Sequence, residues 1–235
     1  MNDNEKGKTF HCFFEQSGTF KKEFKKLGYK AIDYDILNDF GETDKVIDLF
    51  REIELGFVGG GSIFDKIKST DTIVAFFPCI RFENQQVMNY QGTSFQMKNW
   101  SLDQKLAYNM LYHKELHNLY ELITKLVVIC LRKNIPLIIE NPYSTQHFLT
   151  RYWCIKPKII DYDRTQNGDY YMKPTQYWFI NCEPKNNLIF DEPIALHPKK
   201  TISYEKDQVK RSMISPDYAR RFIRQYLIES TNNYD

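Results

Sequence analysis

Short apolar runs recur along the chain, and between them apolar residues are spaced three or four positions apart. The short runs predict strands, because β-branched and aromatic side chains pack well on a pleated surface. The run from Thr72 to Phe77 is apolar almost throughout, which is typical of a strand buried on both faces. Strands are predicted over Thr9 to Phe14, Lys30 to Tyr34, Thr72 to Phe77, Pro136 to Ile139 and Tyr177 to Ile180.

The intervening segments predict helices where apolar residues return at helical spacing. In the first of them, Phe20, Phe24 and Leu27 stand at i, i+4 and i+7, and Gly28 provides a C-cap. The helices are predicted over Thr19 to Leu27, Val46 to Ile53, Ser101 to about Lys133, and Ser215 to Leu227. The apolar face of the longest one is predicted to hold Leu106, Met110, Leu119, Leu122, Leu126 and Ile129.

Strands that alternate with helices predict a Rossmann-like α/β fold, a mostly parallel sheet with helices on both faces. No internal repeat and no Pro/Gly/Ser-rich linker is present, so residues 1–235 are predicted to form a single domain. The segment from Arg81 to Asn99 has no clear period and is predicted to be a long loop, a kind of segment that often forms a lid. The polar segment from Asp161 to Asp169, which includes Arg164, is predicted to be a solvated turn followed by Lys173-Pro174-Thr175, and contact of these residues with a nucleotide phosphate or the rim of the active site is the alternative.

Composition narrows the class of protein. The formal net charge of +2 lacks the strong excess of a protein that coats DNA without specificity. The five cysteines are scattered with no CxxC pair, so neither a zinc site nor a disulfide framework is expected, and no metal is predicted. The polar start of the chain and the shortness of its apolar runs predict a cytoplasmic protein without a membrane segment.

Polar clusters follow several of the predicted strands: Glu15 to Gly18, Asp33 to Asp35, Pro78-Cys79 and Glu140-Asn141. Ligands of open α/β sheets bind beyond the carboxyl ends of the strands, so these clusters are expected to face one pocket.

Two residues of these clusters are candidates for covalent chemistry. A Cys79 thiolate would be a strong nucleophile, although a cysteine in this setting is more commonly a small buried hydrophobe. Glu140 follows an apolar strand, where a carboxyl group needs a polar partner, and hydrogen bonds to backbone amides are the alternative to a catalytic role.

These motifs resemble a known family. Phe77-Pro78-Cys79 resembles the Pro-Cys motif of cytosine carbon-5 DNA methyltransferases, and Ile139-Glu140-Asn141-Pro142 resembles their Glu-Asn-Val motif. The segment from Phe14 to Phe20 is similar to their Phe-Ala-Gly-x-Gly-Gly-Phe loop, and Asp35 matches the acidic position after the second strand. The closest resemblance is to small phage- and mobile-element-encoded proteins labelled DNA methylases, which carry Glu-x-Ser-Gly, Pro-Cys and Ile-Glu-Asn-Pro.

The resemblance implies a methyltransferase fold and mechanism. Cys79 would add to carbon 6 of a cytosine in DNA, and Glu140, with Asn141 in the same motif, would bind the ring. Carbon 5 would then take a methyl group from S-adenosylmethionine (SAM), and the target base would flip out of a duplex. The resemblance places SAM against Phe14, Glu15, Ser17, Gly18, Asp35 and Pro78, and the substrate near Arg81 and Gln176.

The chain also departs from the family. Gly18 stands where the family has several glycines, and Gln176 occupies the place of its Gln-x-Arg-x-Arg motif, without either arginine. Only about Asn181 to Lys210 remains for a separate target-recognition domain, so target reading would need a protein partner. Two alternatives therefore stand beside the enzyme: a catalytically altered, nucleic-acid-binding accessory protein of a mobile element, or another pyrimidine-modifying activity with a different donor.

Overall fold

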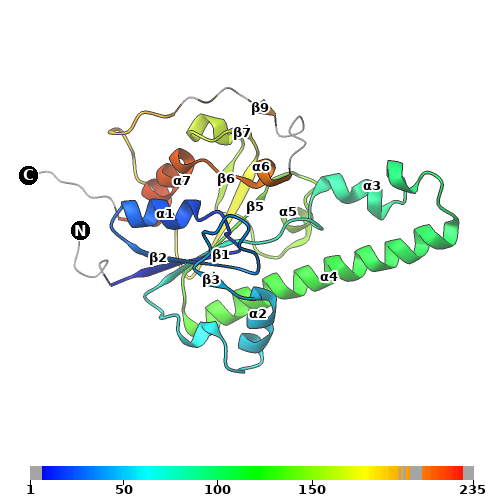
Figure 1. The fold of residues 1–235 in the computed structure, drawn as a ribbon, viewed down its shortest axis with the longest axis horizontal. Coiled ribbons are helices and arrows are strands. Elements are labelled where there is room, and N and C mark those ends of the chain that lie inside the picture. Colours follow the sequence, from blue (N-terminus) through cyan, green and yellow to red (C-terminus); the bar gives the residue numbers. More distant parts are fainter. Residues whose placement is uncertain (1–6, 196, 198–199, 202–207, 230–235) are drawn as a thin grey trace, which may run out of the picture.

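The computed structural model describes residues 7–195, 197, 200–201 and 208–229, which form an α/β fold around one central sheet (Figure 1). The sheet has seven strands in the order β3-β2-β1-β4-β5-β8-β6. Strand β8 is antiparallel to both of its neighbours, and the other pairs are parallel. The predicted mostly parallel sheet is therefore confirmed. Its strands are β1 (Thr9–Phe13), β2 (Lys30–Asp35), β3 (Lys45–Val46), β4 (Thr72–Phe76), β5 (Leu137–Pro142), β6 (Ile159–Asp161) and β8 (Thr175–Ile180).

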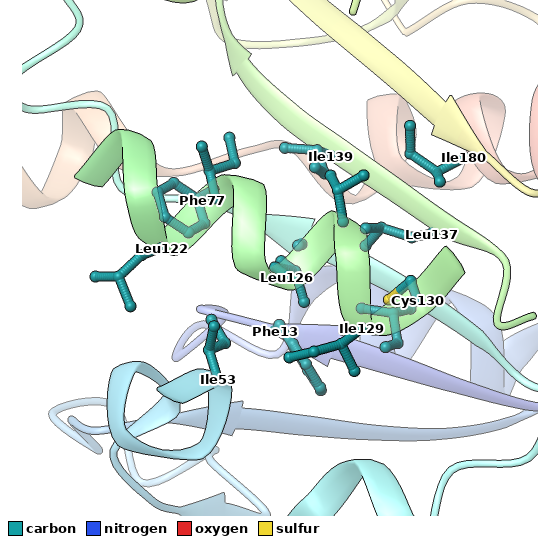
Figure 2. Packing of buried hydrophobic residues seen from close by; sticks show 14 of the residues in the cluster. Phe13, Ile53, Phe77, Leu122, Leu126, Ile129, Cys130, Leu137, Ile139 and Ile180 are labelled. Carbon is teal, nitrogen blue, oxygen red and sulfur yellow. The ribbon is translucent and has the colours of Figure 1, made fainter. Parts of the chain in front are cut away.

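Helices cover both faces of this sheet, as predicted. On one face, α1 (Thr19–Lys26) and α7 (Pro216–Phe222) lie together, and α7 continues into a π-helical turn over Ile223–Leu227. On the other face lie α2 (Leu49–Phe57) and α4 (Leu102–Lys133). Figure 2 shows Leu126 and Ile129 of α4 packed beside Leu137 and Ile139 of β5 in the core of this face.

The shorter elements lie mostly in the connections. They comprise α3 (Val87–Tyr90), α5 (Phe148–Tyr152) and α6 (Gln208–Ser212), 3-10 turns over Ile63–Asp65, Asn84–Gln86, Phe95–Met97 and Arg164–Asn167, and a two-stranded sheet of β7 (Tyr171–Met172) and β9 (Lys200–Thr201). The segment from Arg81 to Asn99 is thus not an irregular loop throughout, because it contains α3 and two 3-10 turns.

The long helix α4 was predicted correctly in extent but not in burial. It begins with a capping box in which Ser101 Oγ accepts from the Gln104 amide at 3.3 Å and Gln104 Oε1 accepts from the Ser101 amide at 2.9 Å. Its buried residues start at Tyr112. Leu106 and Met110, predicted to face the core, are 54% and 74% exposed, because the first turns of α4 extend beyond the sheet (Figure 1).

The second predicted helix starts later than expected. Asp48 caps α2, accepting from the amides of Phe50 and Arg51, so the helix cannot begin at Val46, which instead belongs to β3. Within the described ranges, no helix is long and apolar enough to cross a membrane.

Register brings the strand ends to one edge of the sheet. In β1, Phe13 lies opposite Tyr34 of β2 and Ala75 of β4, and Phe76 of β4 lies opposite Glu140 of β5. The segments that follow β1, β2, β4 and β5 therefore leave the sheet side by side, as expected at the carboxyl edge of an open sheet.

Candidate active site

Cys79 stands three residues beyond the end of β4, on a tight turn. The amide of Phe82 donates to the Cys79 carbonyl at 2.8 Å, which turns the chain so that Glu83 returns beside the cysteine. The thiol of Cys79 donates to Glu83 Oε1 at a sulfur–oxygen distance of 3.0 Å. Burial, followed by the Glu83 charge, raises the pKa of the Cys79 thiol well above its ordinary value, while Lys173 opposes the shift.

Glu140 lies on β5 between Phe76 of β4 and Tyr177 of β8, and only 7% of its surface is exposed. Burial raises the pKa of this carboxyl group, and the charges of Lys173 and Arg164 oppose the shift. The charge of Glu140 also contributes to the raised pKa of Cys79. The carboxyl group and the thiol, from neighbouring strands, are therefore close enough to influence each other electrostatically.

Asn141 fixes the geometry between these two residues. Its fully buried side chain donates through Nδ2 to the carbonyl of Phe77 at 2.7 Å and to that of Glu140 at 2.8 Å. This side chain thus ties the end of β5 to the segment that carries Pro78 and Cys79. In the structure Asn141 is a positioning residue for the turn that presents the thiol.

A buried arginine that the sequence analysis assigned to a solvated turn lies beside Glu140. Arg164 Nη1 is 3.9 Å from Glu140 Oε1, and the guanidinium forms an ion pair with Asp169. Its carbon Cζ stands 4.7 Å from the centre of the Tyr218 ring. Both Arg164 and Asp169 are about 1% exposed, so the prediction of a solvated turn was wrong at these positions.

A pocket of about 440 Å³ opens beside Cys79. Its wall includes Glu83, Lys173 and Arg211, and the buried His147, whose pKa burial lowers to about 4. Its lining residues are Cys79, Ile80, Glu83, Asn84, Gln85, Gln86, Pro142, Tyr143, Ser144, His147, Lys173, Pro174, Arg211 and Ser212. Arg164 and Lys173 belong to the segment for which the sequence left contact with the active-site rim as an alternative, whereas Glu83, four residues after Cys79, was given no role.

The two residues expected to bind substrate are held by protein partners. Arg81 lies outside the pocket lining, where its Nε donates to Glu115 at 2.5 Å and its guanidinium stacks over Tyr112. Gln176 is buried, donating to the Pro142 carbonyl at 2.7 Å and accepting from Thr150 at 2.9 Å. Gln176 therefore stabilises the ends of β5 and β8 from inside the protein.

The interior of the turn between β1 and α1 is occupied by the carboxyl group of Glu15, a residue of the turn itself. Glu15 is buried and accepts from the Phe20 amide at 2.6 Å and the Lys21 amide at 3.2 Å, which are free donors at the start of α1. Phe14 has a φ of 60° and Gly18 a φ of 65°. A side chain at Gly18 would be strained by this φ and would stand 3.2 Å from Lys21 Cε. Ser17 bonds to Thr19 at 3.1 Å.

The residues beside this turn fit the nucleoside part of SAM. Asp35 ends β2 and accepts from the Leu37 amide at 2.8 Å, and its carboxylate is of the type that binds ribose hydroxyls at this position. The next residue, Ile36, is 59% exposed and offers an apolar surface for a base. The Glu15 carboxyl at the start of α1 takes the donors that a dinucleotide diphosphate would use.

Glu15 makes folding stability depend on pH. Burial raises its pKa in the folded protein from 4.5 to about 7, so its stabilising contribution is complete below about pH 4.5 and is lost as the pH rises through 7. Relative to Glu15→Gln, the free energy of unfolding of the wild type is expected to fall by about 2 kcal/mol between pH 5 and pH 8. Urea unfolding at both pH values measures the change, with Glu121→Gln on α4 as control. An equal pH response in the wild type and Glu15→Gln would contradict it.

Among the described residues, no three His, Cys, Asp or Glu side chains are placed to hold a metal ion. Models of known protein families give no match to this chain. A search of curated proteins gives no significant match either. The assignment of a function therefore depends on the geometry and on the resemblance of the motifs.

Proposed function

We propose that the protein transfers a methyl group from S-adenosylmethionine to carbon 5 of cytosine in DNA, through a covalent bond to Cys79. The observation that carries this proposal is a thiol on the wall of a pocket of about 440 Å³, with a buried carboxyl group, that of Glu140, at the end of the neighbouring strand behind the pocket lining. A nucleophile and a proton donor so placed are what addition to a pyrimidine ring requires.

The strand order supports the methyltransferase version of the Rossmann-like fold. An antiparallel strand, β8, lies between β5 and β6 at one end of an otherwise parallel sheet. This arrangement is compatible with the SAM-dependent methyltransferase fold that the resemblance implies. The Glu15 carboxyl occupies the amide donors at the start of α1 that a dinucleotide diphosphate would need, whereas SAM carries no phosphate and does not need them.

Glu140 and Cys79 have separate roles in the addition step. The raised pKa of Glu140 favours its protonated form, which donates a hydrogen bond to ring nitrogen N3 and withdraws electrons from carbon 6. Cys79 adds at carbon 6, and the enamine so formed makes carbon 5 nucleophilic. Arg164, paired with Asp169, places a positive charge 3.9 Å from Glu140 Oε1.

The cofactor is assigned to the β1–α1 turn and the end of β2. Asp35 would bind the ribose, Ile36 would cover the base, and Phe14, Glu15, Ser17 and Gly18 would form the turn beneath it. SAM, when bound, supplies the methyl group that carbon 5 accepts. Pro78 then stands between this turn and the thiol.

DNA and a protein partner complete the proposal. Lys173 and Arg211 place positive charge on the pocket wall, where they would meet the phosphates flanking a flipped cytosine. The connection from β8 to α6 is too short for a target-recognition domain of usual size, so we assign sequence choice to a partner protein.

A second candidate function is a binding protein that has lost methyl transfer. The observation in its favour is the β1–α1 turn, where Glu15 and Gln16 occupy positions at which the family has small residues and Gly18 is the sole glycine. Such a protein would bind nucleic acid in the Cys79 pocket without a methyl donor.

Calorimetric titration of the full chain with SAM separates the two candidates. We expect saturable binding that weakens at least tenfold in Asp35→Ala and is unchanged in Asp39→Ala, a nearby exposed carboxylate. Incubation with SAM and cytosine-containing DNA, followed by digestion and mass analysis, is expected to yield 5-methylcytosine. Absence of SAM binding would favour the accessory protein, and a different pyrimidine product would favour another donor.

A further inference from the structure

Glu83 is an acidic residue that the motif resemblance does not assign, and it makes direct contact with the candidate nucleophile. We propose that Glu83 is the general base that removes the proton of the Cys79 thiol, an inference that rests on the proposed function. The thiol donates to Glu83 Oε1 at 3.0 Å, within the range that proton transfer requires. The family pattern after Pro-Cys is Gln-x-Phe-Ser, whereas this chain has Ile80-Arg81-Phe82-Glu83.

The local fold holds this carboxylate against the sulfur. Residues 79 to 83 form a turn closed by the bond from the Phe82 amide to the Cys79 carbonyl. Phe82 is fully buried and packs edge to face on Tyr120, with ring centres 5.1 Å apart, which fixes the turn on the body of the protein. The carbonyl of Glu83 accepts from Gln86 at 3.0 Å. Glu83 therefore reaches Cys79 from an anchored position on the wall of the pocket.

The environment of Cys79 disfavours loss of the thiol proton, so a base is needed to remove it. Burial disfavours the thiolate, so little of it forms spontaneously near neutral pH. A lysine side chain offers hydrogen-bond donors and no acceptor, so Lys173 is not a candidate for the base. Burial shifts the pKa of Glu140 upward, toward the protonated form, which suits it to donate to the ring rather than to accept from sulfur. Two carboxyl groups in different environments thus take opposite roles.

The reaction balances with SAM as the methyl donor, which would leave as its demethylated product, and water as the acceptor of the carbon-5 proton. The S–H bond breaks and its proton moves to Glu83 Oε1, while the sulfur electron pair forms the S–C6 bond. The electrons of the C5–C6 double bond move into the ring, and N3 takes the proton of Glu140. After carbon 5 has taken the methyl group, it loses its hydrogen as a proton to water. The S–C6 bond then breaks, sulfur recovers the proton from Glu83, and Glu140 recovers its proton from N3.

Alkylation of Cys79 by iodoacetamide tests the base independently of methyl transfer. In the wild type, sulfur can pass its proton to a neighbouring carboxylate, so the alkylation rate is expected to stay nearly flat between about pH 6 and pH 8. In Glu83→Gln the rate depends on thiol ionisation and is expected to rise about tenfold per pH unit. Peptide mapping by mass spectrometry follows Cys79 separately from the other cysteines. Glu121→Gln, remote from the pocket, should match the wild type.

Methylation kinetics supply the second measurement. Glu83→Gln is expected to lower kcat by about 10²- to 10⁴-fold with little change in KM, and Glu83→Asp to recover part of kcat. Alkylation profiles that rise tenfold per pH unit in both wild type and Glu83→Gln would overturn the proposal, as would an unchanged kcat in a folded Glu83→Gln protein. If the wild type does not methylate but its alkylation is flat and that of Glu83→Gln is not, Glu83 is still the base of Cys79 and the proposed function fails alone.

Discussion

Cys79→Ala is expected to abolish the proposed methyl transfer, lowering the rate on the order of 10⁴-fold or more, because the proposal assigns the bond to carbon 6 to the Cys79 sulfur. The substitution removes one small side chain and one hydrogen bond, so the free energy of unfolding should change by about 1 kcal/mol or less. Transfer of a labelled methyl group from SAM to DNA measures the first effect, and urea unfolding measures the second.

The matched control for this prediction is Cys154→Ala. Cys154 is exposed and lies outside the lining of the Cys79 pocket, so its removal should leave the rate unchanged. DNA containing 5-fluorocytosine gives an independent readout, because the adduct cannot lose a proton from carbon 5 and stays attached to sulfur. A covalent complex in the wild type and none in Cys79→Ala is the expected result. Full methylation by Cys79→Ala would remove Cys79 from the role of nucleophile.

Arg164→Met is expected to destabilise the fold by about 3–5 kcal/mol, because it leaves the buried Asp169 without its positive partner. Asp169 also accepts from the Ser215 amide at 2.8 Å, so the loss would extend to the start of α7. Methylation should fall as well, since the positive charge beside Glu140 would be lost. Urea unfolding followed by circular dichroism measures the stability change.

A second substitution separates charge from packing in this prediction. Asp169→Asn in the Arg164→Met background removes the uncompensated charge and keeps an acceptor for Ser215, so about half of the lost stability should return. Arg151→Met, an exposed arginine of α5, should change stability by about 0.5 kcal/mol or less. If Arg164→Met were no more harmful than Arg151→Met, the buried ion pair would have no role in stability.

Strands and the strand-end clusters could be predicted from the sequence because both depend on local patterns. The run from Thr72 to Phe77 is apolar whatever surrounds it in the fold, so it can be recognised as a buried strand from the sequence. A polar residue that follows such a run is expected at the edge of the sheet. Gly18 and Asp35 were found in the same way, and they lie at the carboxyl edge as predicted. The expectation that all the clusters face one pocket is not met by the pocket beside Cys79, because Gly18, Asp35 and Glu140 are not in its lining.

The neighbours of those clusters could not be predicted, because they depend on contacts between distant segments. Arg164 is polar in a polar segment, and only the folded chain places it 3.9 Å from a carboxyl group 24 positions earlier. Leu106 and Met110 have the helical spacing of a buried face, yet α4 has 32 residues and spans about 48 Å. A six-residue strand spans about 20 Å, so part of the helix has no sheet beneath it.

The antiparallel strand β8 sets the order in which the site can be assembled. β5 gains its second neighbour only when residues 175–180 pair with it, and Arg164 and Lys173 come just before that segment. Because synthesis proceeds from the N-terminus, β1, β2 and β4 are complete while one edge of β5 is still open. Cys79 is thus made early, but Glu140 acquires its charged neighbours and its cover late. A nascent or truncated chain ending before residue 164 would carry Cys79 and Glu83 without Arg164, Lys173 and β8, which surround Glu140 in the folded protein.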